Sequence, residues 1–164
     1  MLTQHIKQPV VAVRTLLSLS AAFQSLTGSA DATAALARIH YGYAEDKDGT
    51  SPAQAAKPYP RANVGLSDFR SRNGGTWKNA IQISCEIEAP TPEAEQQNSL
   101  GSQYLWWLGE IETIIDQVKA ESATGEILVV KEIQLSVPPH MTDRFINKKP
   151  IWSTEFIVSA GALS

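Results

Sequence analysis

The sequence predicts a single α+β domain, residues 1–164, in which two helices cover one face of a mostly antiparallel sheet of four to five strands. In two long stretches, 9–27 and 100–119, apolar residues recur every three or four positions, as they do along one side of a helix. Residues 77–88 instead alternate between apolar and polar side chains, which is typical of a strand with one buried face. The length of 164 residues, of which 43% are hydrophobic, suits one domain with a sizeable core.

The elements are expected in the order helix, three strands, helix and two strands. Pro9 suits the first turn of the first helix, where a missing N–H needs no partner, and Gly28 suits the left-handed residue that ends it. Lys131 falls on the apolar side of its strand, which predicts a β-bulge or a sheet edge there. Long loops are expected at residues 45–57 and 138–149. The strands are predicted at residues 36–44, 61–66, 77–88, 127–137 and 151–158.

The second helix, 100–119, is expected to organise the fold, because a helix of that length is about 30 Å long and covers one face of a small sheet. Leu105 and Trp106 point away from the side that would face the sheet. Exposed side chains of this kind indicate a second contact surface, unless a loop of the same chain covers them. The stripe expected to face the sheet consists of Leu100, Tyr104, Trp107, Leu108, Ile111, Ile114, Ile115 and Val118.

Composition and charge argue against several classes of protein. The formal net charge of −3 argues against a protein that binds nucleic acid through bulk charge. One cysteine, Cys85, allows neither an intrachain disulfide nor a cysteine-rich zinc site. The first stretch loosely imitates a signal peptide, but Arg14 interrupts its apolar run and its polar side fits an amphipathic helix, so we favour a mature helix over a secreted protein. No apolar run is long enough to span a bilayer, and no membrane contact is expected.

Neither catalytic residues nor a metal or cofactor site is predicted. The three histidines, His5, His40 and His140, are far apart, and no two have the spacing of metal ligands. Cys85 shares its predicted face with apolar neighbours, so we interpret it as a core residue. The acidic residues of the first long loop lack the pattern of a calcium site, which indicates a solvated loop. The chain is therefore not expected to be an enzyme.

Charged residues gather in two places. The only local basic cluster combines an aromatic residue with three arginines: Arg61, Phe69, Arg70 and Arg72. The polar face of the predicted sheet carries three acidic residues: Glu86, Glu88 and Glu132. Arginine beside an aromatic residue fits a protein interface or stacking on nucleic acid. We favour the interface, because the acidic sheet face has the wrong sign for a nucleic-acid platform.

Three segments, in this order, carry a resemblance to a known family. KPYPRANVGLSD (57–68) is an extended strand with prolines and an aromatic residue, and WKNAIQISCEIEA (77–89) is an alternating strand. PIWSTEFIVSAG (150–161) closes the strand pair that follows the long helix. Over residues 10–161 the arrangement resembles the tail terminator, or tail completion, proteins of tailed bacteriophages. The loop at 45–57 is larger than in that pattern.

The resemblance implies a structural virion protein whose copies, typically about six, form a ring that ends the tail tube and presents the head-docking surface. The implied partners are further copies of the chain, the tail tube protein and the head–tail connector protein, with DNA passing through the pore without specific binding. The implied location is the tail and neck of the virion, after assembly in the host cytoplasm.

Three hypotheses link the residues to this role. Leu105, Trp106 and the basic cluster contact neighbouring copies, because they fit poorly in a solitary domain. The three acidic residues of the sheet face line the pore and repel DNA phosphates. The two long loops contact the tube or the connector.

Two alternatives stay open. One is another phage neck or minor tail component of the head-closure type, although such proteins are usually small barrels and two strong helices argue against a barrel. The other is a small α+β enzyme or ligand-binding module with an apolar pocket between helix and sheet.

Overall fold

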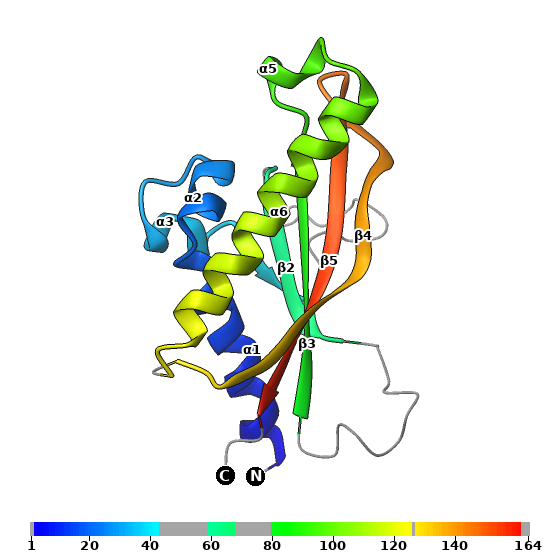
Figure 1. Ribbon diagram of the computed structural model, residues 1–164. Helices are drawn as coiled ribbons and strands as arrows, with labels where there is room; N and C mark the ends of the chain where they lie inside the picture. Colours follow the sequence, from blue (N-terminus) through cyan, green and yellow to red (C-terminus); the bar gives the residue numbers. More distant parts are fainter. Residues whose placement is uncertain (1, 43–58, 68–79, 126, 162–164) are drawn as a thin grey trace, which may run out of the picture.

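The computed structural model describes residues 2–42, 59–67, 80–125 and 127–161. It confirms the predicted α+β fold, with a five-stranded sheet and helices packed against one of its faces (Figure 1). The helices are α1 (Leu2–Ser18), α2 (Ala21–Thr27), α3 (Ala32–Leu36), α5 (Glu93–Gln96) and α6 (Leu100–Ser122). The strands are β1 (Ile39–Tyr41), β2 (Arg61–Leu66), β3 (Ala80–Pro90), β4 (Val130–Ile146) and β5 (Lys149–Gly161).

The sheet has the strand order β1-β2-β3-β5-β4, so β1 and β4 form its two edges. All neighbouring strands are antiparallel except β1, which runs parallel to β2. The register places Val64 opposite Cys85 and Cys85 opposite Phe156, three side chains that share the face covered by helices. Since directly opposed residues point to the same side of a sheet, one face is apolar and the other is polar, as the alternation in residues 77–88 predicts.

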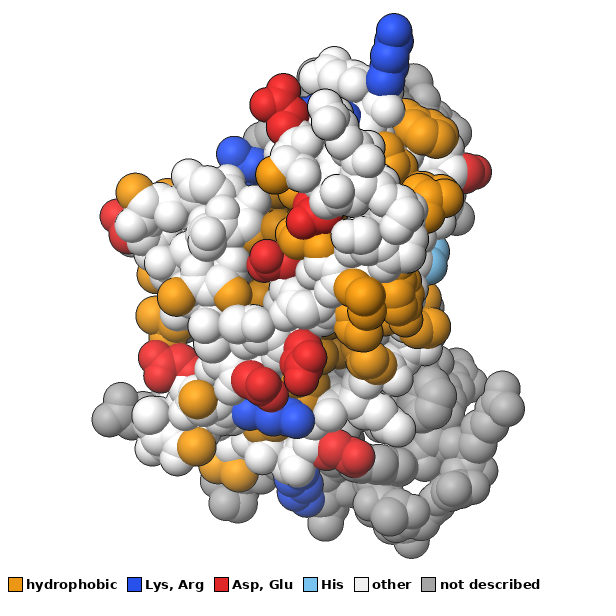
Figure 2. All heavy atoms as spheres, turned by 45° about the horizontal axis from the view of Figure 1, so that its top comes forward, with side chains coloured by type: hydrophobic (Ala, Val, Ile, Leu, Met, Phe, Trp, Pro, Cys, Tyr) orange, Lys and Arg blue, Asp and Glu red, His pale blue; other side chains and the backbone are white. Residues whose placement is uncertain are grey.

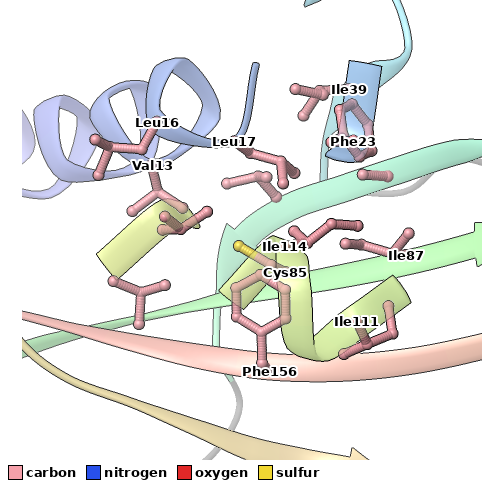
Figure 3. Packing of buried hydrophobic residues seen from close by; sticks show 14 of the residues in the cluster. Val13, Leu16, Leu17, Phe23, Ile39, Cys85, Ile87, Ile111, Ile114 and Phe156 are labelled. Atoms are coloured by element: carbon pink, nitrogen blue, oxygen red, sulfur yellow. The ribbon is translucent and has the colours of Figure 1, made fainter. Parts of the chain in front are cut away.

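The core lies between this apolar face and the helices α1, α2 and α6 (Figure 3). From α1 and α2 it receives Val13, Leu16 and Phe23, each fully buried. Ile83 and Ile87 of β3 are also fully buried, which confirms the inward positions expected for that strand. Burying a side chain of this size contributes about 1.5–3 kcal/mol, so the helix-covered face supplies the main driving force for folding.

The first predicted helix is in fact two helices. α1 and α2 meet at an angle of 75°, because Ser20 begins a new helix: its Oγ accepts a hydrogen bond from the Phe23 N–H. Pro9 lies inside α1 and not in its first turn. Gly28, with φ of 67°, ends α2 in the left-handed conformation, as predicted. Among the described helices, no single one is long and apolar enough to cross a membrane, and α1 and α2 pass that test only as a bent pair.

The segment after Gly28 differs from the prediction. Asp31 caps α3 by accepting a hydrogen bond from the Ala34 N–H, so Leu36 belongs to a helix and not to a strand. β1 is consequently only three residues long. Residues 43 and 44 of the predicted strand, the loop 45–57 and residues 77–79 lie outside the described residues.

α6 begins at Leu100 and ends at Ser122, so the helix runs three residues beyond the periodic stretch 100–119 and stops where the polar and glycine-containing residues 122–125 predict its end. Two members of the predicted inward stripe are exposed: Leu100 by 58% and Tyr104 by 38%. The inward position in the first turn belongs instead to Gln103, which donates to the Asn98 carbonyl and accepts from the Thr91 hydroxyl. The side chains of α6 that are buried are Gln103, Trp107, Ile111, Ile114 and Val118.

The prediction of a loop at residues 138–149 is wrong. β4 continues to Ile146, and a tight turn with positive φ at Asn147 and Lys148 leads into β5. The prolines that suggest a loop are tolerated because β4 is an edge strand, which needs ladder hydrogen bonds on one side only. The register of β4 shifts at four points, and the shift between Val130 and Glu132 confirms the bulge predicted at Lys131.

Candidate interaction surfaces

We first considered residues with catalytic or metal-binding chemistry. Cys85 is fully buried, and that burial raises the pKa of its thiol, with the nearby charge of Glu155 adding to the effect. His40 lies on β1 and His140 on β4, the two opposite edges of the sheet. Across the ranges that the structure describes, no three His, Cys, Asp or Glu side chains come together in a way that could hold a metal ion.

A buried ionic cluster lies on the polar face of the sheet. Glu88 is 3% exposed and lies opposite Arg61, which is 2% exposed, with 3.6 Å between Oε1 and Nε. Arg144 of β4 donates to the other carboxylate oxygen of Glu88. The Arg61 guanidinium stacks 3.9 Å from the ring centre of Tyr59, and both arginines donate to the Tyr59 hydroxyl. The cluster therefore joins β2, β3 and β4 across the sheet.

This cluster corrects two expectations. Arg61 is not an exposed interface residue, because its charge is held inside the fold by Glu88 and Tyr59. Glu88 is not a carboxylate that faces a channel, because two arginines surround it. The sequence pattern missed this, since Arg144 is 56 positions away from Glu88 in the chain. The remaining members of the basic cluster, Phe69, Arg70 and Arg72, lie outside the described residues.

The other two acidic residues share the polar face with Glu88. Glu86 is half-buried and lies between Asn63 of β2 and Glu155 of β5. Burial raises the pKa of Glu86, and repulsion from Glu88 and Glu155 raises it further, while a hydrogen bond with Asn63 acts in the opposite direction. Glu132 is exposed and lies opposite Ser159. Of the three predicted carboxylates, Glu132 is thus the most exposed.

Exposed apolar side chains gather where α6 meets the edge strand β4 (Figure 2). Leu105 is 66% exposed, so no described part of the chain covers it. The Tyr104 ring lies 6.4 Å from the Trp152 ring, and Met141 of β4 is paired with the same Trp152. Leu135, paired with Phe156, points to the same side of the sheet. We call Tyr104, Leu105, Leu135 and Met141 the apolar ridge.

Trp106, the other residue expected to be exposed, has a different environment. It is half-buried, packs against the core and lies 5.5 Å from the Trp107 ring. It also forms a hydrogen bond with Glu110, whose pKa is raised by partial burial. Gln117, eleven positions later and so on the same side of the helix, contacts α2. Trp106 therefore belongs to the flank of α6 that faces α2, and it does not extend the apolar ridge.

A second apolar surface lies at the other edge of the sheet, between α1, β1 and β2. It is a groove of about 370 Å³, lined chiefly by Val10, Val11, Tyr41, Val64 and Leu66, with Lys7 at its rim. Three of these side chains are well exposed: Val11 by 40%, Tyr41 by 49% and Leu66 by 54%. We call these residues the apolar groove.

Arg14 holds one wall of the apolar groove in place. Its guanidinium lies 4.9 Å from the centre of the Tyr41 ring and donates to the carbonyls of Leu36 and Ile39. The rim of the groove is consequently positive, with Lys7 and Arg14 on one side of α1. Sequence analysis missed this groove, because its walls come from three segments whose meeting depends on the tertiary fold.

Comparisons with known proteins do not assign the chain to a family. No model of a protein family matches the chain, and no curated protein matches it. The fold and its surfaces therefore define only a broad class. The chain is an α+β protein with exposed apolar surfaces at both edges of one sheet. Its described residues contain no group of His, Cys, Asp or Glu side chains that could hold a metal ion.

Proposed function

We propose that this chain is a structural virion protein of a tailed bacteriophage, whose copies form a ring that terminates the tail tube and offers the docking surface for the head. The order of elements resembles the tail terminator family over residues 10–161. The observation that carries the proposal is the apolar surface around Leu105, which no described residue covers, because a solitary domain gains nothing from exposing such side chains beside one another.

The rest of the described molecule is compatible with this role. A ring-forming protein needs two different surfaces that fit one another, and apolar side chains are exposed at both edges of the sheet. The polar face is a candidate for the channel wall, where Glu132 would repel phosphate and let DNA pass without specific binding. The tail tube protein and the head–tail connector are the proposed partners at the two ends of the ring.

A ligand-binding module is the second candidate, and the apolar groove is the observation that favours it. Pockets for small molecules usually combine an apolar lining with a few polar groups that orient the ligand. Only two charged side chains of the described residues lie at this groove, Lys7 in its lining and Arg14 against the Tyr41 ring, and both are positive. It therefore suits an apolar side chain of a partner better than a small molecule that must be oriented.

Measuring the mass of the purified protein in solution tests the proposal. Light scattering coupled to size exclusion should give a particle of roughly six times the 17.8 kDa chain mass, and electron microscopy should show closed rings. When added to polymerising tail tube protein, the rings should cap the tubes and shorten them. A particle of one chain at every concentration, with no effect on tube length, would contradict the proposal.

A further inference from the structure

We propose that the apolar ridge of one copy docks into the apolar groove of the next copy, so that chains associate edge to edge in a head-to-tail manner. This inference deepens the proposed function and rests on it for the closure of the ring, but the contact itself is argued from the surfaces alone. The two surfaces are different from one another, so the contact is heterologous and repeats from copy to copy.

The ridge and the groove lie at opposite edges of the sheet, so each can contact a different neighbouring copy. The ridge consists of residues of α6 and β4, and the groove is lined by residues of α1, β1 and β2. Figure 1 shows β4 and β2 on opposite sides of the central strands β3 and β5. With neighbouring strands about 4.8 Å apart, the two edge strands are roughly 19 Å apart. A chain therefore cannot fill its own groove with its own ridge, and a second copy is needed.

Shape and chemistry of the two surfaces match. The ridge projects Leu105 into solvent, and Met141 and Leu135, exposed by 40% and 43%, continue it along β4. The groove is concave and walled by Val11 and Leu66. Joining them removes apolar surface of both copies from water, which is the main driving force for association.

Charge complementarity favours a second copy over other occupants. Lys7 and Arg14 lie on the groove side of α1, which makes its rim positive. Glu112 and Asp116 are exposed on α6, two and three helical turns beyond Leu105 on the same side, and exposed Lys119 follows one turn later, so this flank carries two carboxylates and one ammonium and is negative on balance. Opposite charges beside an apolar centre give the contact a defined orientation and disfavour pairing of groove with groove.

The edge strand itself does not offer an alternative contact through its backbone. β4 contains Pro138 and Pro139 and shifts its register at four points, both of which impair the addition of another strand. Association at this edge is therefore expected to use side chains, which are those of the ridge.

Two variants test the contact, one in each surface. Leu105→Glu disables the ridge and Val11→Glu disables the groove. Both side chains are exposed in the single chain, so neither change disturbs the core. Each variant alone should raise the dissociation constant of self-association at least about tenfold, because a carboxylate would be buried without a partner. Val129→Glu is the matched control, since Val129 is 56% exposed but belongs to neither surface, and it should associate as the wild type does.

Mixing the two variants gives the decisive measurement. Val11→Glu keeps an intact ridge and Leu105→Glu keeps an intact groove, so one intact contact forms between them. The mixture should yield a particle of two chains in a 1:1 ratio that does not grow further, whereas each variant alone stays a single chain. This outcome also shows that both variants are folded. If the mixture stays as single chains, or if either variant alone still assembles like the wild type, the inference is overturned.

The experiment separates this inference from the proposed function. Wild-type rings that persist in both variants would leave the ring proposal standing and remove the ridge and groove as its contact. Open filaments or dimers that depend on both surfaces would support the contact and contradict the closed ring. A wild-type chain that never associates would overturn both.

Discussion

Glu86 and Glu88 are two positions apart on β3, yet their surroundings differ. Glu88 is enclosed by Arg61 and Arg144, so its charge is compensated inside the fold. Glu86 lies beside a second carboxylate, Glu155, and Asn63 provides only partial compensation. A buried charge is tolerated where its partners are fixed and is costly where they are absent. The polar face of the sheet thus combines a structural ion cluster with an acidic pair.

Replacing Glu88 by Gln is expected to destabilise the protein by about 3–5 kcal/mol, because Arg61 and Arg144 would lose the buried carboxylate that both of them contact. Urea denaturation at neutral pH measures the free energy of unfolding. Glu132→Gln on the same face is the control and should change it by less than about 0.5 kcal/mol, since that side chain is exposed. Equal effects of the two substitutions would contradict the role assigned to the cluster.

Glu86→Gln is expected to change how stability depends on pH. The folded-state pKa of Glu86 is raised above its ordinary value of 4.5, so between the two values the folded protein binds more protons than the unfolded one. The contribution of Glu86 to stability is therefore present below the ordinary value and is lost as the pH rises through the folded-state value. Relative to wild type, the Gln variant should gain stability as the pH is raised from about 4 to 7. Denaturation curves at several pH values check this, and a constant difference would refute it.

At the scale of elements, α6 connects the helical layer to the sheet through specific hydrogen bonds. Trp107 donates through Nε1 to the Ser153 carbonyl of β5. On the other side, Gln117 accepts from the Ser20 hydroxyl at 2.7 Å and from the Ala22 N–H at 2.8 Å. Ser20 is also the N-cap of α2, so the break between α1 and α2 is held against α6 by one side chain.

Gln117→Ala is expected to cost about 1–3 kcal/mol, because the Ser20 hydroxyl and the Ala22 N–H lose the acceptor that both use. The loss should be local to α2. Amide hydrogen exchange should therefore be accelerated at Ala22 and in the rest of α2 more than in α6. Thr113→Ala, at an exposed position of the same helix, serves as the control. Uniform acceleration in α2 and α6 would show that Gln117 does not link them in particular.

At the scale of the whole molecule, the sheet presents different surfaces at its two edges, an apolar ridge and an apolar groove. Surfaces that complement each other but differ allow association without a two-fold axis, and the angle between successive copies decides between a ring and a filament. The helix-covered face of the sheet packs in the core, and the polar face contains the ion cluster. Both faces therefore already contribute to the stability of the single chain. This leaves the edges as the surfaces on which a second copy can dock.

Association should make the thermal stability depend on protein concentration, since anything that binds the folded state stabilises it by mass action. Over a roughly hundredfold range of concentration, the Tm of the wild type should rise, while that of Leu105→Glu should stay constant. Scanning fluorimetry measures both. A wild-type Tm that is independent of concentration would indicate that the ridge does not contribute to self-association.

Residues close together in the sequence determined much of this protein. The stripe along α6, the alternation along β3 and the turn at Gly28 all follow from periods and turn preferences that act over a few positions. The exposure of Leu105 followed from the same helical period. These features could be predicted because their physical causes lie within one or two turns of the chain.

The tertiary structure alone decided the features that need a distant partner. Residues 138–146 form a strand because β5 pairs with them, and Glu88 is buried because Arg61 and Arg144 meet it from other strands. The apolar groove exists only where α1, β1 and β2 converge. Local periodicity cannot predict these features. Strand pairing, the burial of charge and the walls of a groove all depend on which segments folding brings together in space.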